Sequence, residues 1–484
     1  MATTTAEEPT SEVTVACAQA RTFAQEHFGG ADLKHKARNA CLLRVAELIC
    51  RHPGGTLPTK LANPADYDAM DRLMNRPETT HASVLAAHRA RTRRLMEQHR
   101  GVVLILHDTT TLDYSGLAIR ELGQIGNGGG RGYLCHNALA VDPSRREVLG
   151  LALQILHRRA QVPAKEGVKA KRERRDRESR LWSTAVEQLG TPLAGRRWID
   201  VADRGADVFE FLATQRRLGR PCLVRACYNR VIVTAGAAGE VRTKLFDHLR
   251  SLPAPAEVRQ QTIYDPKSRE ERQAQLAVAW AAVQVQPPHV AKGEYEKVPI
   301  PVWAVRVWEV NPPKGAKPVE WMLLSSEVVD SAEAAWEKVT WYACRYMVEE
   351  LHKAQKTGCQ IEDLQFRTEQ ALQPMIALLS VVSVLLLNLR LACRQPDADQ
   401  RQATELVDPI YETTLRSWRY KRPHDPLTVK EYYMALARLG GHMNRKSDGP
   451  PGWLVLWRGW MKLHWMVAGV EADRRRHRKN RGET

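Results

Sequence analysis

The chain has 484 residues, 43% of them hydrophobic, and a formal net charge of +17. This length and apolar content are sufficient for a substantial core in about two to four domains. The charge indicates a polyanionic partner; an anionic membrane surface or simple solubility would also account for it. The nine cysteines are scattered and form no CxxC pair. They argue against structural zinc or a disulfide framework and indicate a reduced, cytoplasmic protein.

The N-terminal part is predicted to be helical. Residues 1–12 lack an apolar run, so we expect a disordered start without a secretion signal. From 13 to 100 the pattern predicts a basic helical domain, with helices at Ala37–Arg51, after Asn63-Pro64, and over 78–100. Compact basic helices are common in DNA-binding modules and equally common in ordinary helical bundles, so both interpretations stay open here.

Short apolar runs from residue 102 onward predict a sheet. Val102–Leu106 is typical of a central strand and leads into Asp108. The runs 133–141 and 148–156, joined by Asp142-Pro143-Ser144, predict a hairpin. The glycine-rich segment 126–132 before them lacks a Walker lysine, and we expect a flexible loop there.

Alternating strands and helices follow. The charged segment 157–181 is expected at the surface, with possible phosphate contacts. Arg197–Ala202 predicts a strand that ends at Asp203; a helix over 208–217 and a strand over 222–226 come next. Strands joined by crossover helices indicate an α/β sheet.

Residues 228–327 are strand-like and irregular. Because 146 residues separate Asp203 from Glu349, far more than a strand-to-helix connection needs, we expect an inserted β subdomain here. Its clearest strands are predicted at Trp303–Val310 and Trp321–Ser325.

Helices are predicted for most of the remaining chain, over 332–356, 369–391 and 404–472. The apolar run Met375–Leu387 is short for a membrane span, so we expect a buried core helix and no membrane association. Residues 395–403 look like a linker, and 473–484 like a disordered basic tail that binds polyanions loosely.

One predicted helix carries an unusual polar stripe. Tyr342, Arg345, Glu349, Lys353 and Lys356 have offsets of 0, 3, 7, 11 and 14, which places them within about 80° of helix surface. The opposite face carries Ala343, Met347, Leu351 and Ala354. A carboxylate between cations suits a site for a divalent metal and phosphate oxygens, although a solvated face with i,i+4 ion pairs has the same pattern.

Two further acids favour the site interpretation. Asp108 follows one predicted strand and Asp203 ends another, and ligands gather at strand ends in α/β sheets. Together with Glu349 they could hold two Mg²⁺ ions that activate an attacking oxygen and stabilise a leaving oxygen. His107, beside Asp108, is predicted to be a packing residue rather than a base.

The pattern Tyr-x2-Arg-x3-Glu-x6-Lys at Tyr342, Arg345, Glu349 and Lys356 resembles the signature of bacterial DDE transposases of the IS-four insertion-sequence family. Four further segments are similar to that family: 107–114 and 200–212 to its first and second aspartate motifs, 311–327 to the end of its β insertion, and 432–460 to its dimerisation region. Tyr346 stands where the family has tryptophan.

The resemblance implies an RNase H-like catalytic domain over 101–395, with the β insertion at about 228–327, an N-terminal DNA-binding domain over 13–100 and a C-terminal dimerisation region over 404–472. Asp108, Asp203 and Glu349 would bind two Mg²⁺ ions, for which Mn²⁺ can substitute. Trp321 would stack on a base flipped from the DNA end. The residues expected to contact DNA phosphates are Tyr342, Arg345, Lys353, Lys356, Arg225, Arg51 and Arg72.

The activity implied by the family is cut-and-paste transposition. A homodimer would bind two transposon ends, cleave both strands of double-stranded DNA through a hairpin, and join the 3′ ends to target DNA in the bacterial cytoplasm, at the nucleoid. Two alternatives remain: a non-catalytic DNA-binding dimer, and a metal-dependent nuclease without transfer activity. The three acids and the basic stripe disfavour the first, and the dimer-like C-terminal region disfavours the second.

Overall fold

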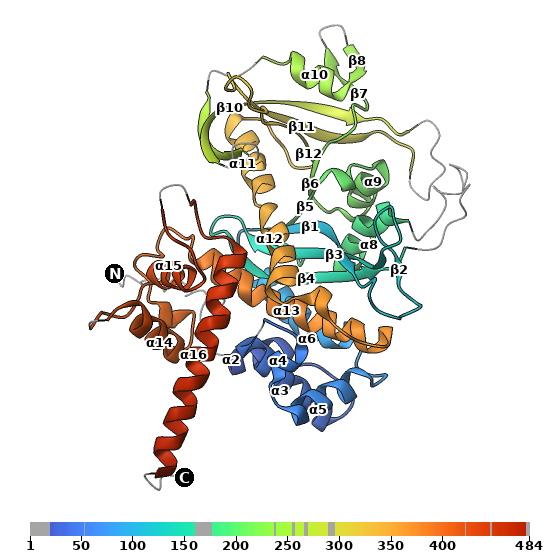
Figure 1. Ribbon diagram of the computed structural model, residues 1–484. Coiled ribbons are helices and arrows are strands. Elements are labelled where there is room, and N and C mark those ends of the chain that lie inside the picture. Colours follow the sequence, from blue (N-terminus) through green and yellow to red (C-terminus); the bar gives the residue numbers. More distant parts are fainter. Residues whose placement is uncertain are drawn as a thin grey trace, which may run out of the picture.

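A computed structural model describes residues 20–52, 54–159, 177–236, 239–253, 257–265, 270–288, 296–421, 423–445 and 448–480. In this part of the chain, helices surround a mixed sheet of twelve strands (Figure 1). The α/β class predicted from the sequence is therefore confirmed. The predicted disorder of residues 1–12 and most of the charged segment 157–181 lie outside the described residues.

Five strands form the centre of the sheet in the order β4-β3-β1-β5-β6. They are β1 (Val102–Asp113), β3 (Arg131–Asp142), β4 (Glu147–His157), β5 (Arg197–Ala202) and β6 (Cys222–Arg225). β3 is antiparallel to β1 and β4, whereas β5 is parallel to β1 and β6. The expected strands and the hairpin are confirmed; in the hairpin turn, the Asp142 carboxylate accepts from the Ser144 N–H at 2.8 Å.

The expectation that β1 ends before Asp108 is wrong. The parallel pairing with β5 stops at His107, opposite Ala202, but the antiparallel pairing with β3 continues to Asp113. Asp108 therefore lies inside a strand, directly after the point where one of its two neighbours ends.

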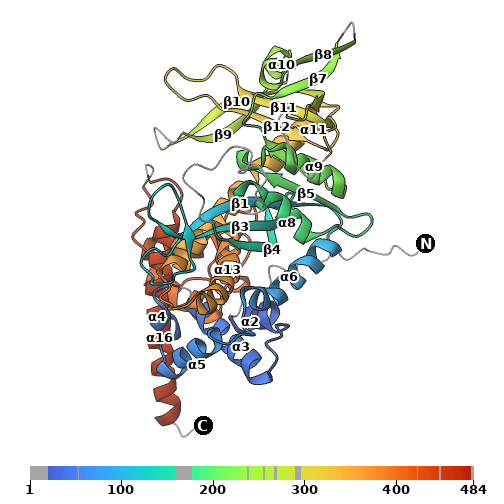
Figure 2. The same ribbon diagram turned by 90° about the vertical axis from the view of Figure 1, so that its right-hand side faces the viewer.

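The inserted strands extend the same sheet instead of forming a separate one. They are β7 (Val231–Gly236), β8 (Gly239–Lys244), β9 (Arg259–Asp265), β10 (Glu270–Val285), β11 (Ile300–Glu309) and β12 (Glu320–Ser325), with the helix α10 (Leu245–Ser251) after β8. β12 pairs antiparallel with β6, Leu323 opposite Arg225, and β10 and β11 continue from there. Figure 2 shows these strands at the end of the molecule away from the N-terminal helices.

The N-terminal helices pack below the central strands. They are α2 (Ala20–Phe28), α3 (Lys36–Arg51), α4 (Leu57–Leu61), α5 (Pro64–Met74) and α6 (His81–Gln98). α6 begins three residues later than the predicted 78 because Thr80 caps it, with its hydroxyl accepting from the Ser83 N–H. Residues of α2–α6, the sheet and α13 share one hydrophobic cluster.

α13 (Glu369–Ala392) runs between the sheet and these helices (Figure 1). By length and composition alone it could span a membrane: its most apolar window has a mean hydropathy of 2.2, and 89% of that window is buried. A helix that is apolar on all sides belongs inside a large core. The prediction of a buried core helix over Met375–Leu387 is confirmed.

The C-terminal region consists of α14 (Pro409–Arg419), α15 (Val429–Leu439) and α16 (Trp453–Asn480). The prediction of a disordered basic tail is wrong up to Asn480, because α16 continues to that residue. The prediction of a linker over 395–403 is also wrong, since Ala398 and Ala403 are only 2% and 1% exposed and belong to the C-terminal core.

Candidate functional site

The predicted continuous helix over 332–356 is broken at the site. α11 (Ala332–Ala343) ends in a tight turn, in which the Arg345 N–H donates to the Tyr342 carbonyl at 3.0 Å. α12 (Tyr346–Lys353) then begins, and Ala354–Gly358 forms a π-helical turn. Burial differs along the stripe: Tyr342 is buried, Arg345 is half-buried, and Glu349 is exposed. Ala343, expected on the apolar face, is exposed.

Three elements bring the predicted carboxylates together. Because His107 of β1 pairs with Ala202 of β5, Asp108 and Asp203 are the next residues on neighbouring strands. α12 packs against β1 and carries Glu349. Asp203 caps a short 3₁₀ turn, with its carboxylate accepting from the Gly205 N–H at 2.9 Å.

The Arg345 guanidinium lies among these acids. It donates to Asp108 Oδ2 at 3.1 Å and forms an ion pair with Glu349. Burial disfavours the charged guanidinium, but Asp108, Tyr342, Glu349 and Asp203 more than offset this and raise the pKa of Arg345. All three carboxylates are therefore within electrostatic reach of one cation.

The pKa of Asp108 is perturbed by its surroundings. Its side chain is 15% exposed, and burial raises its pKa to about 6. Arg345 and the Thr109 N–H, which donates to Oδ1 at 2.9 Å, oppose the rise, whereas Asp203 and Glu349 add to it. A carboxyl group whose pKa is raised toward neutral pH, and which lies beside other acids, is typical of functional sites.

Carboxylate oxygens are the hard donors that Mg²⁺ prefers. Among the residues that the structure describes, however, no three Asp, Glu, His or Cys side chains are grouped closely enough to hold a metal ion. The carboxylate oxygens are suitable ligands for a divalent cation. In this structure the positive charge between Asp108 and Glu349 is the guanidinium of Arg345.

A series of polar contacts begins at Thr109, the residue next to Asp108. The Thr109 hydroxyl is 2.8 Å from His136 Nδ1, and His136 Nε2 is 3.2 Å from His107 Nδ1. His107 Nε2 contacts Asp200 Oδ1 at 2.8 Å, and Asp200 accepts two hydrogen bonds from Arg220. His107 is fully buried, in agreement with the predicted packing role.

An aromatic cluster lies beside the acids. The Trp321 and Tyr342 rings meet edge to face, with centroids 5.2 Å apart. The Arg225 guanidinium lies 5.7 Å from the Trp321 ring centroid and 6.0 Å from that of Tyr342. Three predicted DNA-contacting residues from β12, α11 and β6 are thus neighbours, with Trp321 and Arg225 half-buried.

The remaining predicted cations lie in two places. Lys353, at the end of α12, is paired with Glu350 at 2.8 Å. Lys356, in the π-helical turn, is paired with Glu362 at 3.1 Å. Arg51 on α3 pairs with Glu47, and Arg72 lies on α5. In Figure 1, α3 and α5 lie on the other side of α13 from the carboxylates, so the structure does not bring Arg51 and Arg72 to them.

The π-helical turn contains a group that the sequence pattern did not indicate. Gln355 is fully buried between the two lysines. Its amide donates to the Ser380 hydroxyl of α13 at 2.9 Å and accepts from Asn137 at 3.3 Å. Asn137 is the β3 residue opposite Asp108. This network ties the turn, which lies next to Lys353 and includes Lys356, to α13 and to β3, the strand paired with the one that carries Asp108.

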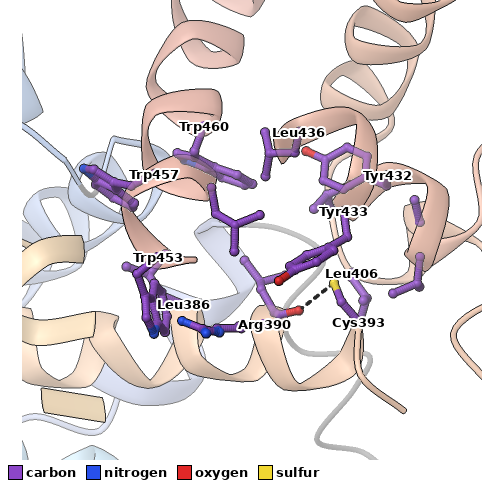
Figure 3. A pocket seen from close by; sticks show the side chains of 15 residues that line it. Leu386, Arg390, Cys393, Leu406, Tyr432, Tyr433, Leu436, Trp453, Trp457 and Trp460 are labelled. Carbon is purple, nitrogen blue, oxygen red and sulfur yellow. Dashed lines mark hydrogen bonds between the residues drawn. The ribbon is translucent and has the colours of Figure 1, made fainter. Parts of the chain in front are cut away.

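The C-terminal helices reach the site through Glu350. Its carboxylate accepts from the Trp453 indole N–H at 2.6 Å and pairs with Arg390 at 2.8 Å, and both acid and arginine are buried. Figure 3 shows Trp453 and Arg390 at one end of a small apolar cavity of about 70 Å³ between α13, α15 and α16. We assign no function to this cavity, which is part of the packing of the C-terminal region.

No known family description matches the chain. Among solved structures, the chain is similar to a piggyBac transposase seen by cryo-EM in a synaptic complex with hairpin DNA. The two are 12% identical, the match covers 61% of this chain and 49% of the transposase, and the TM-score is 0.28. The chain thus spans about half the length of that protein, and a TM-score this low establishes neither a shared fold nor a shared activity.

Proposed function

We propose that the chain is a DNA transposase of the IS-four family, with an RNase H-like core and a catalytic site at Asp108, Asp203 and Glu349. The observation that carries the proposal is the convergence of these acids, from two adjacent strands and one helix, around Arg345. The central strand order β4-β3-β1-β5-β6, in which an antiparallel hairpin precedes two parallel strands, supports the core assignment.

The acids would hold two Mg²⁺ ions, which would activate the attacking oxygen and stabilise the leaving oxygen when bound. Arg345 would exchange its carboxylate partners for a DNA phosphate, and Lys353 and Lys356 would position the backbone beyond it. Trp321 would accept the base that a hairpin end extrudes, with Arg225 holding the adjacent phosphate. A homodimer acting at two transposon ends in the bacterial cytoplasm completes the proposal.

A second candidate is a DNA-binding dimer without catalysis. One observation favours it: Arg345 occupies the space between Asp108 and Glu349, and the described acids are not grouped as a ready metal site. In that case the same basic surfaces would bind DNA, and the acids would only balance the arginine.

Cleavage of DNA distinguishes the two. The substrate is a plasmid that carries the coding region with its flanking DNA. Wild-type protein with Mg²⁺ should cleave it at the element ends, and Asp203→Ala should bind the DNA without cleaving it. Asp113→Asn, which alters an exposed acid of the same sheet, is the matched control and should cleave normally. Binding without cleavage by wild-type protein would favour the second candidate, and near-normal cleavage by Asp203→Ala would refute the assignment.

A further inference from the structure

The glycine-rich segment 126–132 forms one wall of an open groove. The groove consists of two adjoining cavities of about 700 and 630 Å³, which share Arg120, Glu121 and Arg158. One is bounded by the glycine-rich segment and the other by the first residues of α13. Figure 1 shows the loop around β2 (Gly123–Gln124) beside that end of α13.

The groove is strongly cationic. Its lining contains five arginines and two glutamates, which gives a balance of +3 (5 − 2). One of the glutamates, Glu369, is paired with Arg158 at 3.2 Å. In the described part of the chain, no carboxylate lies within ion-pair distance of the other exposed arginines of the lining, Arg120, Arg131 and Arg367.

Arg159, which follows β4, is ion-paired with Glu178 and also donates to the Gly126 carbonyl at 2.7 Å. Arg131 of the loop donates instead to the backbone carbonyls of Arg120 at 2.5 Å and Leu122 at 3.0 Å. A neutral carbonyl orients a guanidinium without cancelling its charge. The arginine fork remains available to an anion such as a phosphate, which it matches in geometry.

The glycines leave this wall of the groove without side chains. A Cβ added at Gly128 or Gly129 would meet no heavy atom within 4 Å, and neither residue has a positive φ. The wall therefore does not need glycine for steric reasons at these two positions. What glycine provides is a bare backbone that a bulky ligand can approach closely, as phosphate-binding loops do.

A series of contacts links the groove to the carboxylate site. Lys356 pairs with Glu362, which also accepts from the Asp113 N–H at 2.9 Å, and the Ser115 hydroxyl accepts from the Arg131 N–H at 2.9 Å. Five residues of β1 separate Asp108 from Asp113, or about 17 Å of strand. That length corresponds to about five nucleotide steps of a duplex.

We propose that this groove binds the phosphate backbone of double-stranded DNA that extends from the carboxylate site. The inference rests on the proposed function, which supplies DNA as the substrate, and it adds a surface that the polar stripe of α12 does not include. The guanidinium groups of the lining match phosphate oxygens in geometry, so the ligand would be held through its phosphates.

A pair of variants at one position tests the charge alone. Gly129→Glu and Gly129→Lys place opposite charges of similar size in the same open space. With a mixed-sequence duplex of about 30 bp, Gly129→Glu should weaken binding and Gly129→Lys should strengthen it. The double variant Arg120→Ala/Arg367→Ala should bind more weakly. Its dependence of log K on log salt should be shallower by about 0.9 for each phosphate that the variant no longer neutralises. Between 50 and 200 mM salt, one such phosphate corresponds to about a 3.5-fold change in affinity.

The outcomes separate this inference from the proposed function. Equal affinities and salt slopes for wild type and all three variants, with wild type binding DNA, would overturn the groove and leave the carboxylate site standing. Absence of duplex binding by wild type would overturn both. A response confined to a mixed-sequence RNA hairpin would overturn the assignment to DNA. Circular dichroism spectra that match wild type exclude misfolding as the cause of weaker binding.

Discussion

Replacing Asp108 with asparagine tests whether the candidate site destabilises the metal-free protein. The amide side chain of the Asp108→Asn variant has nearly the same shape as aspartate, keeps a carbonyl oxygen for the Thr109 N–H, and removes a buried negative charge. Arg345 keeps its ion pair with Glu349 in this variant. The substitution therefore isolates the energetic effect of ionising the carboxyl group at position 108.

The magnitude follows from the pKa. Burial raises the pKa of Asp108 to about 6, against 3.8 for the free side chain. Because the folded protein holds this proton more tightly than the unfolded chain, stability is full below pH 3.8 and falls as the pH rises toward 6. The difference of about two pH units corresponds to about 3 kcal/mol at about 1.36 kcal/mol per unit. Asp108→Asn should escape this loss and be more stable than wild type above about pH 6 by up to about 3 kcal/mol.

Urea unfolding at about pH 3 and about pH 7.5, without divalent metal, measures the effect. A chain of this length need not unfold in one step, so the comparison uses the midpoint of the transition that reports the sheet. The midpoints should coincide at the lower pH and favour Asp108→Asn at the higher pH. Added Mg²⁺ should raise the wild-type midpoint and leave that of the variant nearly unchanged, because a ligand of the folded state stabilises it in proportion to occupancy.

Asp113→Asn is the control on the same strand. Asp113 is exposed, and hydrogen bonds from Ser115 lower its pKa, so its amide variant should gain no stability at the higher pH. A midpoint for Asp108→Asn that lies below wild type at the higher pH would refute the reasoning, since it would mean that the ion pair with Arg345 outweighs burial.

Three further outcomes are expected. Asp200→Asn should lower the thermal stability measured by calorimetry by about 3–5 kcal/mol, because it leaves the buried Arg220 without its carboxylate partner. Trp321→Ala should impair hairpin formation more than first-strand nicking on denaturing gels, whereas equal loss of both with a lowered melting temperature would assign Trp321 to the core alone. Trp465→Glu, at an α16 residue that is 59% exposed, should prevent pairing of two DNA-bound molecules on native gels while single-end binding persists.

The sheet could be predicted well because its strands carry local signals. Val103, Leu104, Ile105 and Leu106 are fully buried, and a short branched apolar run of this kind is typical of a central strand covered on both faces. The length of β1 could not be predicted. Its second half, 108–113, is mostly polar and pairs with β3 on one side only, a tertiary effect that periodicity does not register.

The candidate site was predictable residue by residue and not in its geometry. Strand ends and helix spacing pointed to Asp108, Asp203 and Glu349. The turn at Arg345 and the π-helical turn at Gln355 were missed, because an uninterrupted 3.6-residue period was assumed through both. The available signal was the position of Gln355, four residues after Leu351, since a polar residue on the apolar side of a helix needs a partner elsewhere in the fold.

The neighbours that each residue of the stripe meets determine how the site would work. Tyr342 packs against Trp321, and Arg345 lies between Asp108 and Glu349. An arginine in that position keeps close acids from repelling one another, so the fold can hold them together before any metal or DNA arrives. The same arginine must release its partners when a phosphate binds, and binding of DNA and assembly of the metal site would then be coupled through one side chain.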